Sequence, residues 1–326
     1  MDVFCVGMYR ACSTWQYEVA AHLLEHHRDG RLLGFMLGEE YAGRERRSGH
    51  PVGWRVLKSH EGHRRFAAAL AEGRAKAIYA HRDLRDVVFS FMYKRGMSFE
   101  EFLRHGLIHQ VVENDRFWTA QPHRLDQRYE DLIADPAEGV EQIARHLGIA
   151  LEPGEADEVA SEYSFERNRK RTRDLQRRLR ETVGDLGDPM LSQVYDGRTL
   201  LHWNHLRDGR AGGWRDQATP RQREAMHRIV GDWLIAHGYE SDDSWVGDPW
   251  SDRPLERARL GAAIARGDAA CKLRGLSARY PLLANVVKAG LRIPNEPPLA
   301  RPAPEPRPKA PFTHPTRPAV ATSKAG

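Results

Sequence analysis

The sequence predicts an α/β fold in which a central parallel sheet carries helices on both faces. Short runs at 3–6, 53–60 and 75–80 have the length and composition of buried strands. Each run is followed by apolar residues at helical spacing. Strands that alternate with helices indicate crossover units, and a parallel sheet built from such units binds ligands beyond the carboxyl ends of its strands.

The first unit joins the strand at 3–6 to a helix over 16–27 through a tight loop. The loop carries the cation Arg10 and closes on two hydroxyl residues, Ser13 and Thr14. Loop amides and a helix N-terminus both favour an anion. The Gly-x-x-x-x-Gly-Lys-Ser/Thr pattern of a Walker A loop is absent. The stretch therefore indicates a phosphate site of another kind, or an ordinary capped helix after a strand.

The second unit is separated from the first by residues 28–51, which are charged and glycine-rich. They indicate a loop or a short helix at the surface. The strand over 53–60 precedes a helix over 61–71. That strand ends in a lysine, a serine and a histidine, namely Lys58, Ser59 and His60.

The third unit begins with the strand at 75–80, which ends at Arg82. Asp83 follows at the position of an N-cap for the helix over 83–94. Polar clusters thus follow all three strands, and the carboxyl ends of parallel strands share one edge of a sheet. We expect Arg10, the Lys58–His60 cluster and Arg82 to meet in one pocket.

The later segments are mostly helical in pattern. An amphipathic segment at 97–121 and a capped helix over 135–147 are followed by a strongly charged stretch at 155–182. That stretch indicates a solvated helix face, or a basic lip for an anionic acceptor. Residues 184–218 are glycine-rich and indicate a mobile lid, and 219–237 the last helix of the core.

Composition narrows the class of protein. The 326 residues are 40% hydrophobic and carry a formal net charge of +5, which suits an anionic ligand without naming one. No apolar run has the length of a membrane span, and no signal peptide precedes the first strand. Three cysteines (Cys5, Cys12, Cys271) lack disulfide or metal-ligand spacing, which predicts a reducing cytoplasm. The arginine-rich, lysine-poor composition indicates a GC-rich bacterial genome.

The composition of the chain changes beyond Gly238. We predict three regions: a main domain over 1–240, a linker with a helical extension over 241–293, and a disordered tail over 294–326. The helical periodicity at 255–291 is interrupted by Pro281, and ten of the nineteen prolines lie in the tail. The tail is basic, so an acidic partner or a membrane surface are its candidate partners. No nucleic acid partner is expected.

Five segments, in order, resemble the motifs of sulfotransferases that use 3′-phosphoadenosine 5′-phosphosulfate. Tyr9 to Trp15 resembles the family's 5′-phosphosulfate loop, and Lys58-Ser59-His60 its Lys-Thr-His strand end. Tyr79–Tyr93 resembles the family's 3′-phosphate motif, and Tyr129–Leu132 its Tyr-Glu-Asp-Leu segment. Arg207–Arg215 resembles its late Arg-Lys-Gly loop. The ordered set is far more specific than any one member, and it implies the P-loop-like sulfotransferase fold over 1–240.

The resemblance implies a donor site. Its members are Arg10, Ala11, Cys12, Ser13, Thr14, Trp15, Arg82, Ser90, Tyr129, Arg207, Asp208 and Gly209. Arg82 and Ser90 would bind the 3′-phosphate, while Trp15 would stack on the adenine with Tyr129 near its edge. The family requires no metal, and no acidic pair positioned for Mg²⁺ is visible.

The chemistry of sulfuryl transfer assigns the catalytic roles. Charge builds on the departing 5′-phosphate while the acceptor loses a proton, so positioning and electrostatics should supply most of the acceleration. Arg10 would neutralise the leaving phosphate and Lys58 the bridging oxygen. His60 is the natural general base because an imidazole is largely neutral near pH 7. The acceptor would be a hydroxyl of a small molecule, glycan or lipid, or less readily an amine.

Several residues have structural alternatives. His60 could be structural, Arg82 could pair with Asp83 or Asp86 on a solvated surface, and Ser90 could bond to its own helical turn. The aromatic residues Trp15 and Tyr129 could belong to the core.

The chain also departs from the family pattern. Cys12 replaces a glycine, so it must adopt φ < 0 or carry strain. Tyr9 replaces a proline and Asp208 a lysine, which removes positive charge from the donor site. The competing functions are a P-loop-related kinase and an inactive binding protein on the same fold. The sequence does not determine the oligomeric state.

Overall fold

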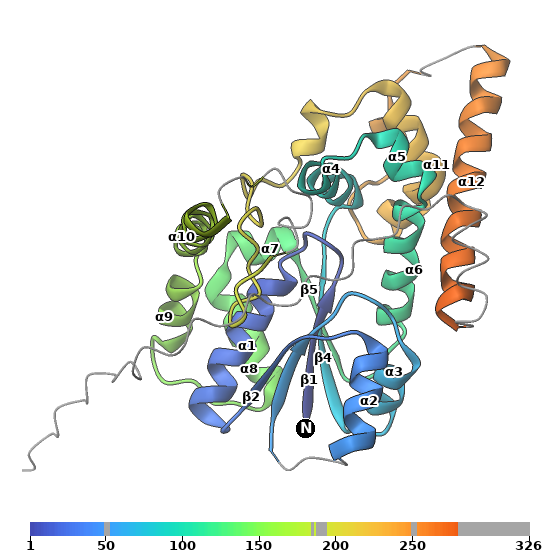
Figure 1. Cartoon of the computed structure of the whole chain (residues 1–326). Coiled ribbons are helices and arrows are strands. Elements are labelled where there is room, and N and C mark those ends of the chain that lie inside the picture. Colours follow the sequence, from blue (N-terminus) through green and yellow to red (C-terminus); the bar gives the residue numbers. More distant parts are fainter. Residues whose placement is uncertain (49–52, 184–185, 187–193, 249–252, 280–326) are drawn as a thin grey trace, which may run out of the picture.

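The central feature of the fold is a five-stranded parallel sheet with the strand order β2-β3-β1-β4-β5 (Figure 1). This computed structural model describes residues 1–48, 53–183, 186, 194–248 and 253–279. The strands are β1 (Asp2–Gly7), β2 (Arg31–Phe35), β3 (Arg55–Lys58), β4 (Ala75–His81) and β5 (Arg124–Arg128). The predicted parallel α/β fold is confirmed.

Helices cover both faces of the sheet. Residues 1–183 contribute α1 (Ser13–His27), α2 (Gly38–Ser48), α3 (Arg64–Ala71), α4 (Leu84–Arg95), α5 (Phe99–Arg104), α6 (Leu107–Thr119), α7 (Tyr129–Ala134), α8 (Pro136–Leu147), α9 (Glu155–Glu162) and α10 (Phe165–Val183). The remainder contributes η2 (Gly213–Asp216), α11 (Pro220–Ala236), η3 (Ser244–Val246) and α12 (Pro254–Arg279). In Figure 1, α1 and α8 lie on one side of the sheet and α2 and α3 on the other.

Side chains that alternate between the two faces of the sheet explain why β1 lies at its centre. Val3 and Cys5 point into a core formed with α1 and α8, whereas Phe4 and Val6 point into a core formed with α2, α3 and α6. All four are fully buried. A strand that is buried on both faces needs a continuous apolar run, which is what the sequence has at 3–6.

One sequence prediction was wrong. Residues 28–51 are not simply a loop or short helix, because they contain strand β2 as well as helix α2. The strand forms one edge of the sheet and its side chains are exposed or only half-buried. Gly34, where the pairing of β2 with β3 shifts, further weakens its strand pattern.

The last helix packs back onto the main domain. Gly106 before α6 and Gly267 of α12 approach so closely that a Cβ on either would overlap the other segment's backbone. Leu260 of α12 belongs to the same core cluster as α4 and α11. The predicted boundaries at 240 and 293 stay predictions.

The proline-rich tail, Pro281 and most of 184–193 in the predicted lid lie outside the described residues. Among the residues that the structure describes, no helix combines the length and the apolar character that a membrane crossing needs.

Candidate functional site

The site lies at the carboxyl ends of β3, β1 and β4, which are neighbours in the sheet. Backbone contacts tie the three tips together. The Nη1 of Arg82 donates a 3.1 Å hydrogen bond to the carbonyl of Arg10, and the Nδ1 of His60 lies 2.9 Å from the carbonyl of Gly7. The structure thus brings the three predicted polar clusters to one place.

The loop between β1 and α1 is held in an unusual conformation. Gly7 has φ +152° and its Cα approaches Ala80 so closely that a Cβ would overlap that residue's backbone. Arg10 and Cys12 adopt φ values of 67° and 70°, in the left-handed region. Of the two alternatives for Cys12, the strained one is therefore correct, at a cost of about 1–2 kcal/mol. Ala11 is buried beside it.

Helix α1 begins at the end of this loop, and its first-turn amides have no hydrogen-bond partner among the described residues. Its N-cap, Cys12, gives no side-chain hydrogen bond, and Ser13 and Thr14 are both almost fully buried. The Oγ1 of Thr14 lies 3.4 Å from Nε2 of His205. The first-turn amides therefore remain available to an anion.

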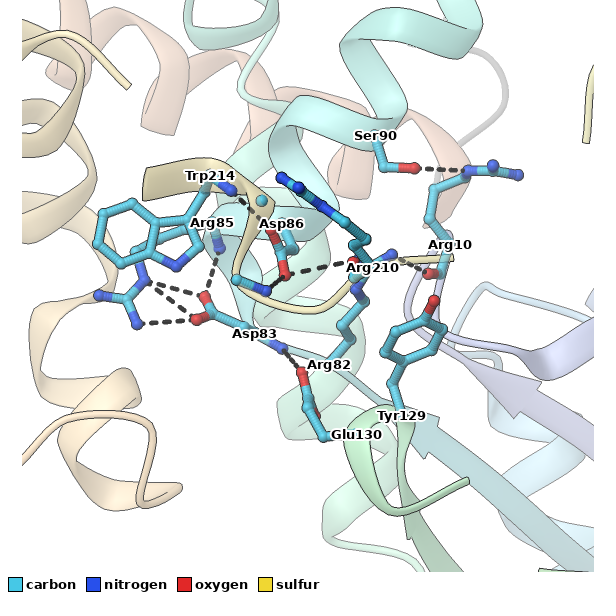
Figure 2. A network of polar contacts seen from close by, with 12 residues as sticks. Arg10, Arg82, Asp83, Arg85, Asp86, Ser90, Tyr129, Glu130, Arg210 and Trp214 are labelled. Carbon is cyan, nitrogen blue, oxygen red and sulfur yellow. Dashed lines mark hydrogen bonds and ion pairs between the residues drawn. The ribbon is translucent and has the colours of Figure 1, made fainter. Parts of the chain in front are cut away.

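Arg10 points toward helix α4 rather than toward Arg82 (Figure 2). Its Nε donates a 3.0 Å hydrogen bond to Oγ of Ser90, and its Nη2 donates to the carbonyl of His205. Among the described residues, the Ser90 hydroxyl accepts from Arg10 and makes no hydrogen bond to its own helical turn. Burial, and then the charge of Arg82, lowers the pKa of Arg10 to about 10.

Lys58 and His60 form a hydrogen-bonded pair behind Arg10. The Nζ of Lys58 lies 2.8 Å from Nε2 of His60, whose Nδ1 faces the Gly7 carbonyl. The carbonyl can only accept, so Nδ1 carries the proton and Nε2 accepts from Lys58. Burial, followed by the charge of Lys58, holds the pKa of His60 well below its usual value. Burial also lowers the pKa of Lys58 to about 7.

Arg82 lies in a buried polar network (Figure 2). Its guanidinium stacks 4.0 Å from the ring centre of Tyr129 and pairs with Asp86 at 3.5 Å. The pairing with Asp86 was one predicted alternative, but its location was wrong, because both side chains are buried rather than solvated. The Nη2 of Arg82 donates to the carbonyl of Arg210 at 2.6 Å.

The loop at 205–214 closes over this network. The hydroxyl of Tyr129 donates to the carbonyl of Gly209 at 3.0 Å, and Asp86 accepts from the amides of Gly212 and Trp214 at 2.6 and 2.9 Å. Trp214 is buried and anchors the loop by packing into the core.

The two polar side chains at the start of this loop contact other loop residues. Arg207 donates to Gln217 at 3.2 Å, and Asp208 lies 3.7 Å from Arg207.

These elements enclose a cavity of about 410 Å³. Ten of the predicted site residues line it: Arg10, Cys12, Thr14, Trp15, Arg82, Ser90, Tyr129, Arg207, Asp208 and Gly209. Ala11, Ser13, Lys58 and His60 are not in its wall. The cavity therefore brings together most residues of the predicted donor site, whose role stays a prediction, and the Lys58–His60 pair lies outside it.

Sequence reasoning missed further residues around Arg10. Lys94 is half-buried, and its pKa is held well below its usual value by burial and then by Arg10, Lys58 and Arg95. It lies one helical turn beyond Ser90, a spacing that could have revealed it. His205 comes from an irregular segment without periodicity, so no sequence signal pointed to it.

Comparison with known proteins decides the family. A model of the sulfotransferase domain matches residues 2–238. The chain belongs to the sulfotransferase family. It is 26% identical over 212 residues to Sulfotransferase 2A6 of Mus musculus, covering 59% of this chain and 69% of the relative. It is 29% identical over 194 residues to 3-alpha-hydroxysteroid sulfotransferase of Cavia porcellus, covering 54% of this chain and 61% of that relative.

Solved structures show the same fold. Mouse sulfotransferase SULT7A1 complexed with PAP has a TM-score of 0.52 at 17% identity, covering 73% of this chain and 85% of the other. Retinol dehydratase in a complex with retinol and PAP has a TM-score of 0.52 at 20% identity, covering 72% and 81%. The predicted sulfotransferase class and fold are thereby confirmed.

Proposed function

We propose that this sulfotransferase moves a sulfuryl group from 3′-phosphoadenosine 5′-phosphosulfate to a hydroxyl acceptor, or less readily to an amine. The observation that carries the proposal is a cluster of cations without counter-charges. Among the described residues, Arg10, Lys58 and Lys94 form no ion pair with a carboxylate. Arg10 lines the cavity, and the nearby Lys58 and Lys94 add to its positive charge, which favours an anionic substrate. The family membership and the PAP bound by its solved neighbours support this donor.

The donor's phosphates are bound by the cationic side of the cavity. Arg10 and the amides of Ala11 to Thr14 hold the 5′-phosphosulfate at the start of helix α1. Arg82 holds the 3′-phosphate together with Ser90, and Arg207 and the Gly209 backbone close over it. Ser90 already accepts a hydrogen bond from Arg10, so both phosphates share one network.

The donor's base is bound on the other side of the cavity, where aromatic side chains line the wall. Trp15 and Phe165 both line it, and two aromatic faces suit a flat base. Phe165 was not among the residues predicted from sequence.

The transfer step uses Lys58 and His60 together. The acceptor oxygen forms a bond to sulfur as the bond from sulfur to the 5′-phosphate oxygen breaks, and the acceptor's proton passes to Nε2 of His60. In the resting site that nitrogen accepts a hydrogen bond from Lys58. Lys58 therefore turns to the departing phosphate oxygen, where its charge stabilises the transition state and frees the base. The product nucleotide leaves with both phosphates.

The acceptor approaches His60 through aromatic surroundings. The ring of Tyr9 lies 4.6 Å from that of His60 and stacks on Phe91 at 4.8 Å. These contacts favour an apolar alcohol over a highly charged glycan. The names of related proteins are consistent with this class, since one relative is a 3-alpha-hydroxysteroid sulfotransferase and one solved neighbour holds androsterone.

The decisive experiment is transfer of label from radioactive donor to a panel of phenols, steroid alcohols, sugars and amines. We expect label on an apolar alcohol, and a loss of about 10²- to 10⁴-fold in His60→Ala with PAP binding retained. The exposed His26→Ala serves as the matched control and keeps full activity.

Three results would contradict the proposal. PAP binding without transfer to any acceptor would favour the inactive binding protein. Binding of ATP with Mg²⁺ but not of PAP would favour a kinase. A His60→Ala enzyme with near-normal activity would exclude His60 as the base. The cytoplasmic location, the bacterial origin and the role of the tail stay predictions.

A further inference from the structure

The cavity wall contains two chemically different sets of side chains. One set is four arginines, Arg10, Arg82, Arg207 and Arg210. The other set, the apolar wall, consists of aromatic and apolar side chains and includes Trp15, Leu132, Ile133, Pro136, Tyr163 and Phe165. If the donor binds as proposed above, its phosphates lie against the arginines and its purine against the apolar wall. The inference below rests on that proposed function.

A single carboxyl group belongs to the apolar wall. Glu18 follows Trp15 by three residues and Thr14 by four on helix α1, so all three share one face of the helix. Its side chain lines the cavity although the residue is only 3% exposed. Its Oε2 accepts a 2.8 Å hydrogen bond from Nδ2 of Asn168 on helix α10. Its Oε1 is buried and has no hydrogen-bond partner among the described residues.

The orientation of Asn168 determines which oxygen of Glu18 is free. Arg171 donates a 2.7 Å hydrogen bond to Oδ1 of Asn168, and arginine can only donate. The amide nitrogen of Asn168 must therefore face Glu18, and Oε2 must accept. A proton on the carboxyl group then belongs on Oε1, the oxygen without a partner.

The surroundings favour the protonated acid. Burial raises the pKa of Glu18 to about 8, and Asp196 and Glu162 also raise it, against the opposing effects of Asn168 and Arg171. At neutral pH the free oxygen is thus a hydroxyl donor. A buried donor without an acceptor is costly, so a ligand that supplies an acceptor is favoured.

We propose that Glu18, oriented by Asn168, recognises the donor's base by donating a hydrogen bond from Oε1 to a ring nitrogen, N1 or N7, of adenine. A purine with hydrogen at N1, such as hypoxanthine, offers a donor where adenine offers an acceptor. The site would reject such a base if N1 is the partner. The α1–α10 contact therefore contributes to nucleotide specificity as well as to packing.

The experiment measures binding of adenosine 3′,5′-bisphosphate and of its 1-deaza and 7-deaza analogues by calorimetry. We compare the full-length wild type with Glu18→Gln and Glu18→Ala. In Glu18→Gln the amide oxygen accepts from Asn168 and the amide nitrogen donates, which imitates the neutral acid. Glu25→Ala, on the same helix but outside the cavity wall, is the matched control.

We expect the wild type to bind one deaza analogue about 3- to 10-fold more weakly than the parent nucleotide. Glu18→Gln and Glu25→Ala should keep that ratio, and Glu18→Ala should reduce it to about one. Because each ratio compares two ligands of one variant, partial unfolding of a variant does not affect it.

Two negative results have different meanings. If the wild type binds no adenosine bisphosphate, the proposed donor itself is wrong. If it binds the nucleotide but does not discriminate against either analogue, or if Glu18→Ala keeps the discrimination, only the role of Glu18 is overturned. Glu18 would then serve to join α1 to α10.

Discussion

Buried cations have different partners at the two ends of strands β1 and β3. At the amino ends, Arg55 donates two hydrogen bonds of 2.6 Å to the two carboxylate oxygens of Asp2, and Tyr41 adds a third of 2.7 Å. At the carboxyl ends of the same strands, Arg10 donates to Ser90 and to a backbone carbonyl, and Lys58 to His60. One end is neutralised internally and the other is not.

If the cations at the carboxyl ends bind the donor as proposed, this difference separates structural charge from functional charge. A buried cation with a bidentate carboxylate partner needs nothing further, whereas one that donates only to neutral groups gains by meeting an external anion. Arg85 is a second structural case, paired with Asp83 at 2.8 Å (Figure 2). It also pairs with Glu240 at 2.6 Å. Arg82 is intermediate, because Asp86 lies 3.5 Å away.

The largest expected effect is a loss of stability at the amino ends of β1 and β3, where Asp2 neutralises Arg55. Asp2→Ala leaves Arg55 buried without its counter-charge and should lower the free energy of unfolding by about 3–5 kcal/mol. Chemical denaturation measures this loss, while kcat per folded molecule should stay unchanged. The exposed Asp157→Ala, in the first turn of α9, should cost less than about 1 kcal/mol. A loss no greater in Asp2→Ala than in this control would remove the contrast between the two ends.

For Lys58→Met we expect the reverse of Asp2→Ala, namely a loss of activity without a loss of stability. Methionine keeps an unbranched side chain but removes a buried cation, so stability should be kept or rise. The value of kcat should fall about 10²- to 10³-fold because the leaving phosphate loses its stabilising charge. Transfer assays and denaturation on the same preparation test both halves. A matched fall in stability and activity would make Lys58 a structural residue.

The pH dependence sharpens the comparison further. Burial lowers the pKa of Lys58 to about 7 from an ordinary value of 10.5. The free enzyme then loses this charge as pH rises through about 7, so kcat/KM for the donor should fall on the alkaline side, by about tenfold per pH unit. Lys58→Arg should move that decline to higher pH because arginine stays protonated.

Stability should follow pH in the other direction. Between pH 7 and 10.5 the unfolded chain holds the Lys58 proton and the folded protein does not, so this group makes the protein more stable as pH rises. A kcat/KM profile that is flat in the wild type and unchanged in Lys58→Arg would show that Lys58 does not lose its charge near neutral pH.

The smallest expected effect concerns the strained loop at the cationic end. Cys12 has φ 70°, a conformation that glycine adopts freely. Cys12→Gly should raise the free energy of unfolding by up to about 1 kcal/mol, with the relief of strain partly offset by the freedom of glycine in the unfolded chain. Thermal unfolding and PAP calorimetry measure the two consequences. Lower stability together with weaker PAP binding would mean that the thiol itself contributes.

Local signals explain what could be predicted from sequence. Strands β1, β3 and β4 have distinct apolar runs, and Asp83, Asp135 and Thr219 cap the helices they precede. The meeting of the polar residues after the strands could be predicted because the carboxyl ends of all strands of a parallel sheet lie at the same edge, whatever the strand order. Strand β2 was missed since an edge strand with half-exposed side chains has no clear pattern.

Long-range contacts explain what could not be predicted. The partner of Ser90 is 80 residues away, and Asn168 meets Glu18 across 150 residues. Such pairs depend on how helices cross, which no periodicity encodes. The position of Lys58 and His60 outside the cavity wall likewise required the folded arrangement.

The hydrogen bond between Lys58 and His60 bears on hydrolysis of the sulfuryl donor when no acceptor is bound. While Nε2 of His60 accepts from Lys58, it has no lone pair with which to activate a stray water molecule. If His60 is the base, an activated sulfate bound in the absence of acceptor is therefore protected from idle hydrolysis. In that case, the contact that prepares the pair for transfer also limits the loss of donor between turnovers.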